Sequence, residues 1–288
     1  MNAQQLPLPG HERRHPRFRK RMHLLPSLFT AGNILLGYAA ISQAMQGSVS
    51  EAWRFDNAAK AIGFAIVLDI LDGRIARITH TTSDFGRELD SLADVITFGV
   101  APALLAWMWG FRLLPPLYDP ELRTTLVRLG FIATFAFMIA GAARLARFNI
   151  QVNPQPSNPG RPGRKYFVGM PIPAAAGVVA AVIHFARGNP ITQWWTAALW
   201  LLLLLSASFL MVSTWRFYSF KDIDLRAQRP FRVFVLVALT FAAIVLFSRY
   251  VLFLLALTYM LSGVLVRLFY IVRHRCAAAA LAEASQPQ

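Results

Sequence analysis

The sequence predicts an all-α fold, a polytopic membrane bundle of about eight transmembrane helices. Hydrophobic residues make up 56% of the chain and the mean hydropathy is +0.46, whereas soluble domains contain about 45–50% apolar residues. The apolar residues also form long blocks, and a helix needs about 20 mostly apolar residues to cross a bilayer. Arginine and lysine gather between these blocks. The blocks cover approximately residues 27–46, 58–78, 89–110, 125–145, 168–186, 194–214, 231–248 and 250–271.

The first block follows a basic tail, residues 1–23. We interpret this block as a true transmembrane helix, because it is long and no small-residue cleavage site clearly follows it. The run HERRHPRFRKR at residues 11–21 places the N-terminus in the cytoplasm, since cytoplasmic segments of membrane proteins carry an excess of lysine and arginine. The tail is also amphipathic enough to lie on the membrane surface. A surface-bound tail and a simple topology signal both remain open.

Residues 24–275 are predicted to form one membrane domain with short polar loops, followed by a flexible C-terminal tail at residues 276–288. The longest loop, residues 149–166, is rich in proline, glycine and asparagine and is not expected to be helical. The last two blocks are nearly continuous, and we expect a tight helical hairpin that breaks near residues 248–250. An even number of spans then returns the C-terminus to the cytoplasm.

The formal net charge of +15 would suggest a nucleic-acid partner in a soluble protein. Here the basic residues border apolar blocks, so membrane topology and anionic lipids account for them better, and we expect no nucleic acid. The single cysteine, Cys276, excludes an internal disulfide.

Acidic residues occur inside or beside the second and third blocks, where ionisable groups are costly and indicate function. These residues are Asp69, Asp72, Asp90 and Asp94. At about 100° per helical residue, the first two share one helix face with Gly73 and the last two share another with Gly86. The polar segment 78–85 can connect two antiparallel helices, so the four carboxylates are predicted to meet.

Carboxylates brought together in this way repel one another, and a divalent cation relieves the repulsion. Ligands made only of oxygen favour a hard cation such as magnesium, manganese or calcium. Gly73 and Gly86 lie on the aspartate faces, where the lack of a side chain lets a ligand approach closely. Arg77 can bind a phosphate or pair with an aspartate. This combination suits phosphoryl transfer, while the simplest alternative is a set of aspartate–arginine pairs at the membrane surface.

From Asp69 to Asp94 the chain follows the pattern D-x2-D-G-x2-A-R-x8-G-x3-D-x3-D. All eight fixed positions match the signature of the CDP-alcohol phosphatidyltransferases, so the chain resembles this family. The resemblance implies two divalent ions per site, magnesium or manganese, with calcium as a possible bound species. It implies that three aspartates are metal ligands and that Asp94 is both a metal ligand and the general base. The three are Asp69, Asp72 and Asp90. The implied CDP-lipid contacts are Gly73, Arg77 and Ser83, and Gly86 is placed with them. Thr30 and Asn33 lie inside the first block, where a buried asparagine must find a partner, either another helix or the cytidine of the substrate.

Other segments resemble the serine-using, integral-membrane branch of that family in bacteria. They are 26-PSLFTAGNILLGY-38, 89-LDSLADVITFGVAPALL-105, 143-ARLARFN-149, 166-YFVGMPIPAAAG-177 and 208-SFLMVSTWRFYSFK-221. Serine is a zwitterion, so its carboxylate needs a cation, and an arginine offers a two-pronged donor. Candidates for this carboxylate, or for a phosphate, are Arg144, Arg147 and Lys165. Each could instead serve only as a positive charge that sets topology.

The resemblance implies transfer of the phosphatidyl group from CDP-diacylglycerol to L-serine, which gives phosphatidylserine and CMP. It also implies a homodimer in the bacterial inner membrane, surrounded by membrane lipids, with its active site facing the cytoplasm. A sister enzyme that uses glycerol 3-phosphate, inositol phosphate or choline is the first alternative. A cation-coupled transporter is the second, although it would spread polar residues over several spans, whereas here the carboxylates cluster in one hairpin.

Overall fold

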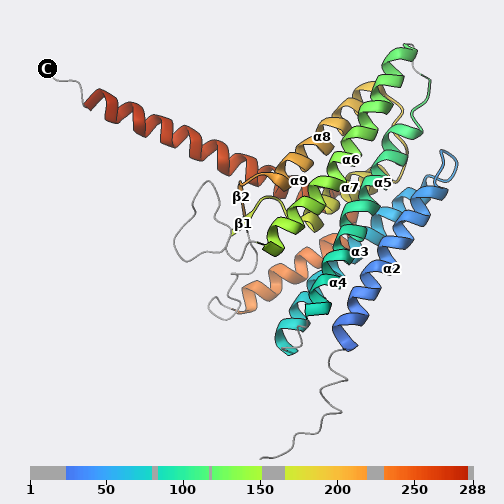
Figure 1. Cartoon of the computed structure of the whole chain (residues 1–288), viewed down its shortest axis with the longest axis horizontal. Coiled ribbons are helices and arrows are strands. Elements are labelled where there is room, and N and C mark those ends of the chain that lie inside the picture. Colours follow the sequence, from blue (N-terminus) through green and yellow to red (C-terminus); the bar gives the residue numbers. More distant parts are fainter. Residues whose placement is uncertain (1–23, 80–83, 117–118, 151–165, 219–229, 285–288) are drawn as a thin grey trace, which may run out of the picture.

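The computed structural model describes residues 24–79, 84–116, 119–150, 166–218 and 230–284, and most of these residues are helical (Figure 1). The α-helices are α2 (Leu24–Gln46), α3 (Trp53–Thr79), α4 (Asp84–Asp94), α5 (Ala101–Trp107), α6 (Pro120–Ile150), α7 (Ile172–Phe185), α8 (Trp194–Val212) and α9 (Pro230–Ala284). Two π-helical segments, η1 (Val95–Val100) and η2 (Met108–Arg112), flank α5. Two short antiparallel strands, β1 (Tyr166–Val168) and β2 (Arg216–Tyr218), pair beside the bundle.

The predicted all-α membrane fold is confirmed. Within the described residues, 5 helices are long and apolar enough to cross a membrane: α2, the rod formed by α4, η1, α5 and η2, and then α6, α8 and α9. The second predicted block forms the 27-residue α3, which carries Asp69 and Asp72. The fifth block is shorter than expected. It was predicted at 168–186, but Val168 belongs to β1 and the helix α7 has 14 residues, with Pro171 as its N-cap.

The third span is one continuous rod from α4 to η2, but its hydrogen bonds change from the α to the π pattern at η1 and again at η2. Pro102 lies at the start of α5 and has no N–H to donate to the preceding turn. Just before it, the N–H of Ala101 bonds to the carbonyl of Ile96, five residues back. Such π-turns are rare and frequently occur at functional sites. This one begins directly after Asp94.

The core lies where α3, α5, α6, α7 and α8 meet, and it is built from alanines and a few large side chains. Phe98, Phe137 and Ile172 are almost completely buried there. Large apolar side chains also cover the outside of the bundle, and Phe64 and Leu202 are each more than half exposed. A soluble protein would not leave so much apolar surface in water, so these outer faces fit contact with lipid.

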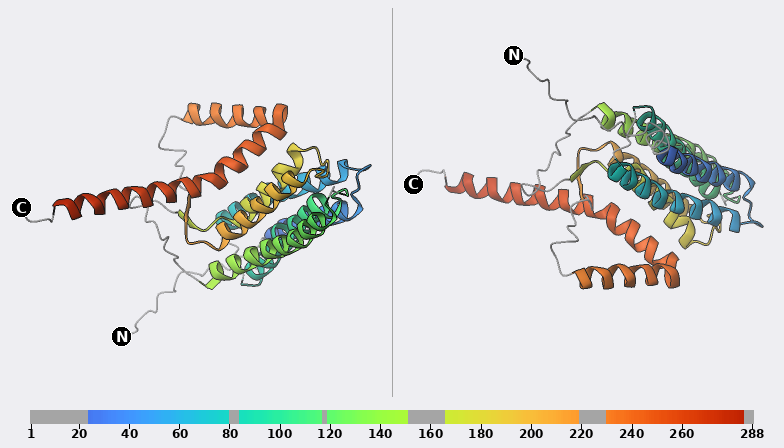
Figure 2. Two further views of the ribbon diagram at one scale, coloured as in Figure 1. Left: turned by 90° about the horizontal axis from the view of Figure 1, so that it is seen from above. Right: turned by 90° about the horizontal axis from the view of Figure 1, so that it is seen from below.

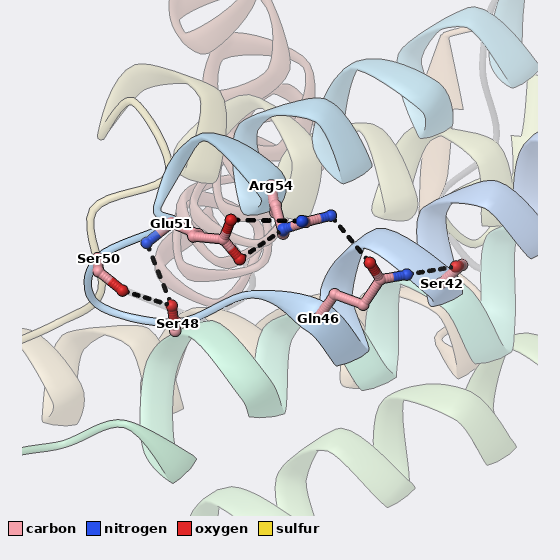
Figure 3. A network of polar contacts seen from close by, with 6 residues as sticks. All are labelled: Ser42, Gln46, Ser48, Ser50, Glu51 and Arg54. Carbon is pink, nitrogen blue, oxygen red and sulfur yellow. Dashed lines mark hydrogen bonds and ion pairs between the residues drawn. The ribbon is translucent and has the colours of Figure 1, made fainter.

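The connection between α2 and α3 lies at the end of the bundle away from Asp69 and Asp72, here called the far end (Figure 1). Polar contacts fix this connection (Figure 3). Arg54 donates to Glu51 through Nε at 2.8 Å and to Gln46 through Nη1 at 2.9 Å. Ser48 accepts a hydrogen bond from the backbone N–H of Glu51 at 3.1 Å. These local bonds fix the turn that joins α2 and α3.

The last two predicted blocks both lie in α9, which contains a kink at Phe247 (φ −131°, ψ 40°). The kink is one residue before the expected break at 248–250. Beyond it the chain turns back, so that the two halves of α9 diverge in a V (Figure 2). The second half packs against α7 and β2, while Val245 and Leu246 in the first half are more than half exposed.

Gly188, in the loop after α7, is expected to tolerate substitution by alanine poorly. Its φ is +74°, and an added Cβ would lie 2.1 Å from the carbonyl oxygen of Ala52. We expect Gly188→Ala to lower the free energy of unfolding by about 2 kcal/mol or more, because backbone strain and a clash with fixed backbone add. Gly63→Ala is the control, since an added Cβ there meets no described atom within 4 Å and helix propensity favours alanine by about 1 kcal/mol. Thermal unfolding in detergent should shift in opposite directions for the two variants. Equal midpoints would contradict the proposed clash.

Candidate active site

Three aspartates from two helices meet at one end of the bundle. Asp69 comes from α3, and Asp90 and Asp94 come from α4, the next helix along the chain. One carboxylate oxygen of each lies within 4.8 Å of the other two. The prediction that the two aspartate-bearing helix faces oppose each other therefore agrees with the structure for these three residues. We call them the acidic cluster.

Asp72, the fourth predicted ligand, lies beside the acidic cluster but is held by α2. Its Oδ2 accepts a hydrogen bond from the hydroxyl of Thr30 at 3.1 Å. Its Oδ1 is buried and has no hydrogen-bond partner among the described residues. Asp72 is close enough to Asp90 for their charges to interact. One carboxylate oxygen is thus fixed by the protein, and the other is left for a ligand.

Asp94 ends α4 just before the π-turn. Its Oδ1 is buried without a partner in the described part of the chain. Its charge interacts with those of Asp69, Asp90 and the guanidinium of Arg144. The wider π-turn that follows changes the direction in which the next residues point, so Asp94 faces the cluster while Thr97 faces α2.

The chemistry of the acidic cluster fits a hard divalent cation. Three carboxylates within 4.8 Å of one another repel when ionised, and two buried carboxylate oxygens, one on Asp72 and one on Asp94, lack hydrogen-bond donors among the described groups. An unpaired buried oxygen costs free energy unless a donor or a cation satisfies it. Oxygen-only ligands are those that magnesium, manganese and calcium prefer.

The helix α2 lies directly against the π-turn. The hydroxyl of Thr97 donates to the backbone carbonyl of Asn33 at 3.1 Å. An added Cβ on Gly37 would lie 2.6 Å from that hydroxyl, so only glycine permits this approach. Neither Thr97 nor Gly37 was selected from the sequence, where a single hydroxyl in an apolar block carries little signal. Asn33 itself is 2% exposed, and its side-chain Oδ1 has no described partner.

The two arginines near the end of α6 occupy different surroundings. Arg144 is 8% exposed, and its Nε has no hydrogen-bond partner in the described region. Arg147 instead donates to the carbonyls of Val212 at 2.8 Å and Ser213 at 3.3 Å, where α8 ends. Arg147 therefore caps α8, while Arg144 is the buried guanidinium that still has donor capacity near Asp94.

The remaining predicted residues are described in part. An added Cβ on Gly73 would meet no described atom within 4 Å, which agrees with open space on the Asp69–Asp72 face. Gly86 lies in the first turn of α4, half-buried. The side chain of Arg77 and all of Ser83 and Lys165 lie outside the residues that the structure describes.

Residues 23–206 match the family model of the CDP-alcohol phosphatidyltransferases. The chain belongs to the CDP-alcohol phosphatidyltransferase family. As a member of this family it is a membrane-embedded transferase. The matched region contains all four aspartates and Arg144, whereas β2 and α9 follow it.

This family member is similar to several curated proteins named CDP-diacylglycerol–serine O-phosphatidyltransferase. The protein of that name from Helicobacter pylori is 37% identical over 227 residues, which cover 76% of this chain and 82% of the relative. The one from Bacillus subtilis is 34% identical over 200 residues, covering 69% of this chain and 93% of the relative. The one from Mycobacterium leprae is 34% identical over 255 residues, covering 85% and 75%.

Proposed function

We propose that this chain transfers the phosphatidyl group of CDP-diacylglycerol to L-serine and releases phosphatidylserine and CMP. The observation that carries the proposal is the acidic cluster together with the buried Arg144 near Asp94, whose Nε has no hydrogen-bond partner among the described residues. The relatives described above supply the two substrates through their names. The acidic cluster and Asp72 would hold two divalent ions, magnesium or manganese. Bound there, such ions neutralise the phosphate oxygens of the nucleotide lipid.

The residues of the chain then have distinct tasks. Asp94 accepts the proton of the serine hydroxyl, because its Oδ1 is buried and has no donor of its own in the described region. The serine oxygen forms a bond to the lipid-side phosphorus as the bond from that phosphorus to the CMP oxygen breaks, and the electron pair leaves with CMP. A base positioned in this way contributes roughly 10²–10⁴-fold to the rate. Thr30 holds Asp72 in place from α2.

The acceptor site is assigned to the neighbourhood of Arg144. A free amino acid brings a carboxylate, and a buried guanidinium with unused donors suits it. Arg144 is 8% exposed, so its interaction with a carboxylate would be little weakened by water. Arg147 is less suited, since its guanidinium already bonds the end of α8.

Lysine substitutions should distinguish the roles of Arg144 and Arg147. Arg144→Lys keeps the charge but loses the planar two-pronged donor, so we expect the KM for L-serine to rise about tenfold or more, equivalent to roughly 1.4 kcal/mol. Arg147→Lys should leave that KM within about twofold and lower the thermal midpoint instead. Steady-state kinetics and thermal unfolding in detergent provide the two measurements. A raised serine KM in Arg147→Lys with none in Arg144→Lys would reverse the assignment.

The function is tested by CMP release from purified protein in detergent with CDP-diacylglycerol and manganese. L-serine should support release, while glycerol 3-phosphate, inositol phosphate and choline should not. Release with another alcohol would retain the phosphatidyl transfer and overturn the serine assignment. A folded, metal-binding protein that releases no CMP with any acceptor would support the transporter alternative.

We also propose that the enzyme lies in the bacterial inner membrane with both termini and the active site on the cytoplasmic side. Cys276 is the single cysteine of the chain, which makes it a topology reporter without further engineering. A membrane-impermeant maleimide should label it in inverted vesicles and not in right-side-out vesicles. The homodimer implied by the family resemblance remains a prediction, which chemical cross-linking in native membranes would test.

A further inference from the structure

A second group of buried ionisable and hydroxyl side chains lies at the far end of the bundle, away from the acidic cluster. His184, in the last turn of α7, is hydrogen-bonded through Nδ1 to Oδ1 of Asp56 and through Nε2 to the hydroxyl of Ser248 at 3.0 Å. Asp56 also pairs with Lys60 at 2.7 Å through its other oxygen. Asp56 and His184 are each 7% exposed. We call these three residues the Asp56–His184–Ser248 bridge.

The bridge joins three helices that have no loop in common. Asp56 lies at the start of α3, His184 at the end of α7, and Ser248 next to the kink of α9. The Asp56 carboxylate can only accept, so Nδ1 of His184 carries the hydrogen that it shares with Asp56. The Ser248 hydroxyl can donate or accept, so its bond to Nε2 is available whether the imidazole is neutral or protonated.

Aromatic packing surrounds the bridge on the side of α9. The ring of Phe185 stacks on that of Phe253 with centroids 4.5 Å apart, and it meets the ring of Tyr250 edge-on at 5.7 Å. These contacts fix α9 sideways against α7. The directional hydrogen bond from Ser248 fixes its position along the helix axis, which ring packing alone defines poorly.

The same half of α9 reaches the acceptor side of the active site. Tyr259 follows Ser248 by 11 residues, or about 16 Å along a helix. Its ring lies against that of Phe217 in β2 at 5.7 Å, and an added Cβ on Gly263 would overlap the Phe217 ring at 2.3 Å. Tyr259 is close enough to Arg144 for the two groups to interact electrostatically. A shift of α9 along its axis would therefore move Tyr259 relative to Arg144.

We propose that Asp56, His184 and Ser248 are positioning residues, which set the axial position of α9 and thereby hold Tyr259 beside Arg144 at the acceptor side of the site. This proposal rests on the function proposed above. It assigns a role to α9, which lies beyond the residues matched by the family model.

The test uses the full-length enzyme and the variants Ser248→Ala and Ser248→Thr. Ser248→Ala removes the hydroxyl, and we expect the KM for L-serine to rise about threefold to tenfold with kcat and the KM for CDP-diacylglycerol within about twofold. Ser248→Thr keeps the hydroxyl and should restore the wild-type KM. Ser206→Ala is the matched control, because among the described residues its hydroxyl bonds to the carbonyl of Leu202 in its own helix and to no other helix. An unchanged serine KM in Ser248→Ala would overturn the proposal, even if the thermal midpoint fell.

A distance measurement keeps this test independent of the serine assignment. Spin labels at the exposed positions Phe64 in α3 and Leu265 in α9 can be introduced after Cys276→Ser removes the natural cysteine. The distance distribution should shift or broaden in Ser248→Ala and return to the wild-type form in Ser248→Thr. An unchanged distribution would refute the bridge as a positioning device. If it changes while the wild-type enzyme shows no activity with serine, the proposed function fails and the positioning of α9 stands.

Discussion

Asp94→Asn is expected to lower CMP release by about 10²–10⁴-fold at saturating metal and serine. Asparagine has nearly the same shape, but it cannot accept the proton of the serine hydroxyl at neutral pH. The substitution also removes one negative charge from a cluster in which three carboxylates lie within 4.8 Å of one another. The fold should survive, because no described hydrogen bond uses Oδ1 of Asp94. The measurement is CMP release under initial-rate conditions, with thermal unfolding to establish that the variant is folded.

Glu88→Gln is the matched control for this prediction. Glu88 lies on the same helix, α4, but is exposed and does not belong to the acidic cluster. It loses the same charge by a comparable isosteric change, so it should retain wild-type CMP release. If Asp94→Asn retained more than about a tenth of the wild-type rate, Asp94 could not be the general base.

Asp90→Asn is expected to have opposite effects on activity and on metal-free stability. Without metal, the carboxylates of the acidic cluster repel, so removing one charge should raise the thermal midpoint of the EDTA-treated protein above that of the wild type. With metal, the order should reverse. A site that binds a ligand only in the folded state stabilises it by about 2.7 kcal/mol when the ligand is at 100 times its Kd, and the variant should lose most of this gain together with its activity.

Thermal unfolding in detergent with EDTA and then with a manganese titration tests this prediction. Glu88→Gln again provides the control, because an exposed carboxylate outside the cluster should change neither midpoint appreciably. A variant that is stabilised by manganese as strongly as the wild type would show that Asp90 is not a ligand. A variant less stable than the wild type in EDTA would show that repulsion does not dominate the empty cluster.

Much of the acidic site was predictable from sequence, because helix periodicity relates residues that are close along the chain. The spacing from Asp69 to Asp94 places the carboxylates on two facing stripes, and three of them meet in the structure. The same reasoning proposed a fourth member, Asp72, but it could not show that Thr30, 42 residues away, bonds one of its oxygens.

Contacts between segments that are far apart along the chain were harder to predict from the sequence. Thr97, Gly37 and the Asp56–His184–Ser248 bridge depend on which helices lie side by side, and no local pattern marks them. The partners of His184 in particular could not be predicted, because Asp56 and Ser248 are 128 and 64 residues away along the chain. The length of α7 was also misjudged, because hydropathy does not reveal that Val168 pairs in a strand before the helix begins.

The shortness of α7 has a consequence for how a water-soluble substrate reaches a site built among membrane helices. Its 14 residues span about 21 Å, against roughly 30 Å for the hydrocarbon core. We expect the non-helical polypeptide that precedes it to lie within the depth of the bilayer, where its polar groups are satisfied internally: the N–H of Gly169 donates to Trp215 O, and that of Met170 to Leu210 O. Non-helical backbone at this depth is tolerated where it is buried in protein or lines a water-filled cavity. We expect the β1–β2 end of the bundle to form a hydrated entrance, through which an amino acid could approach Asp94 from water while the lipid substrate arrives sideways from the bilayer.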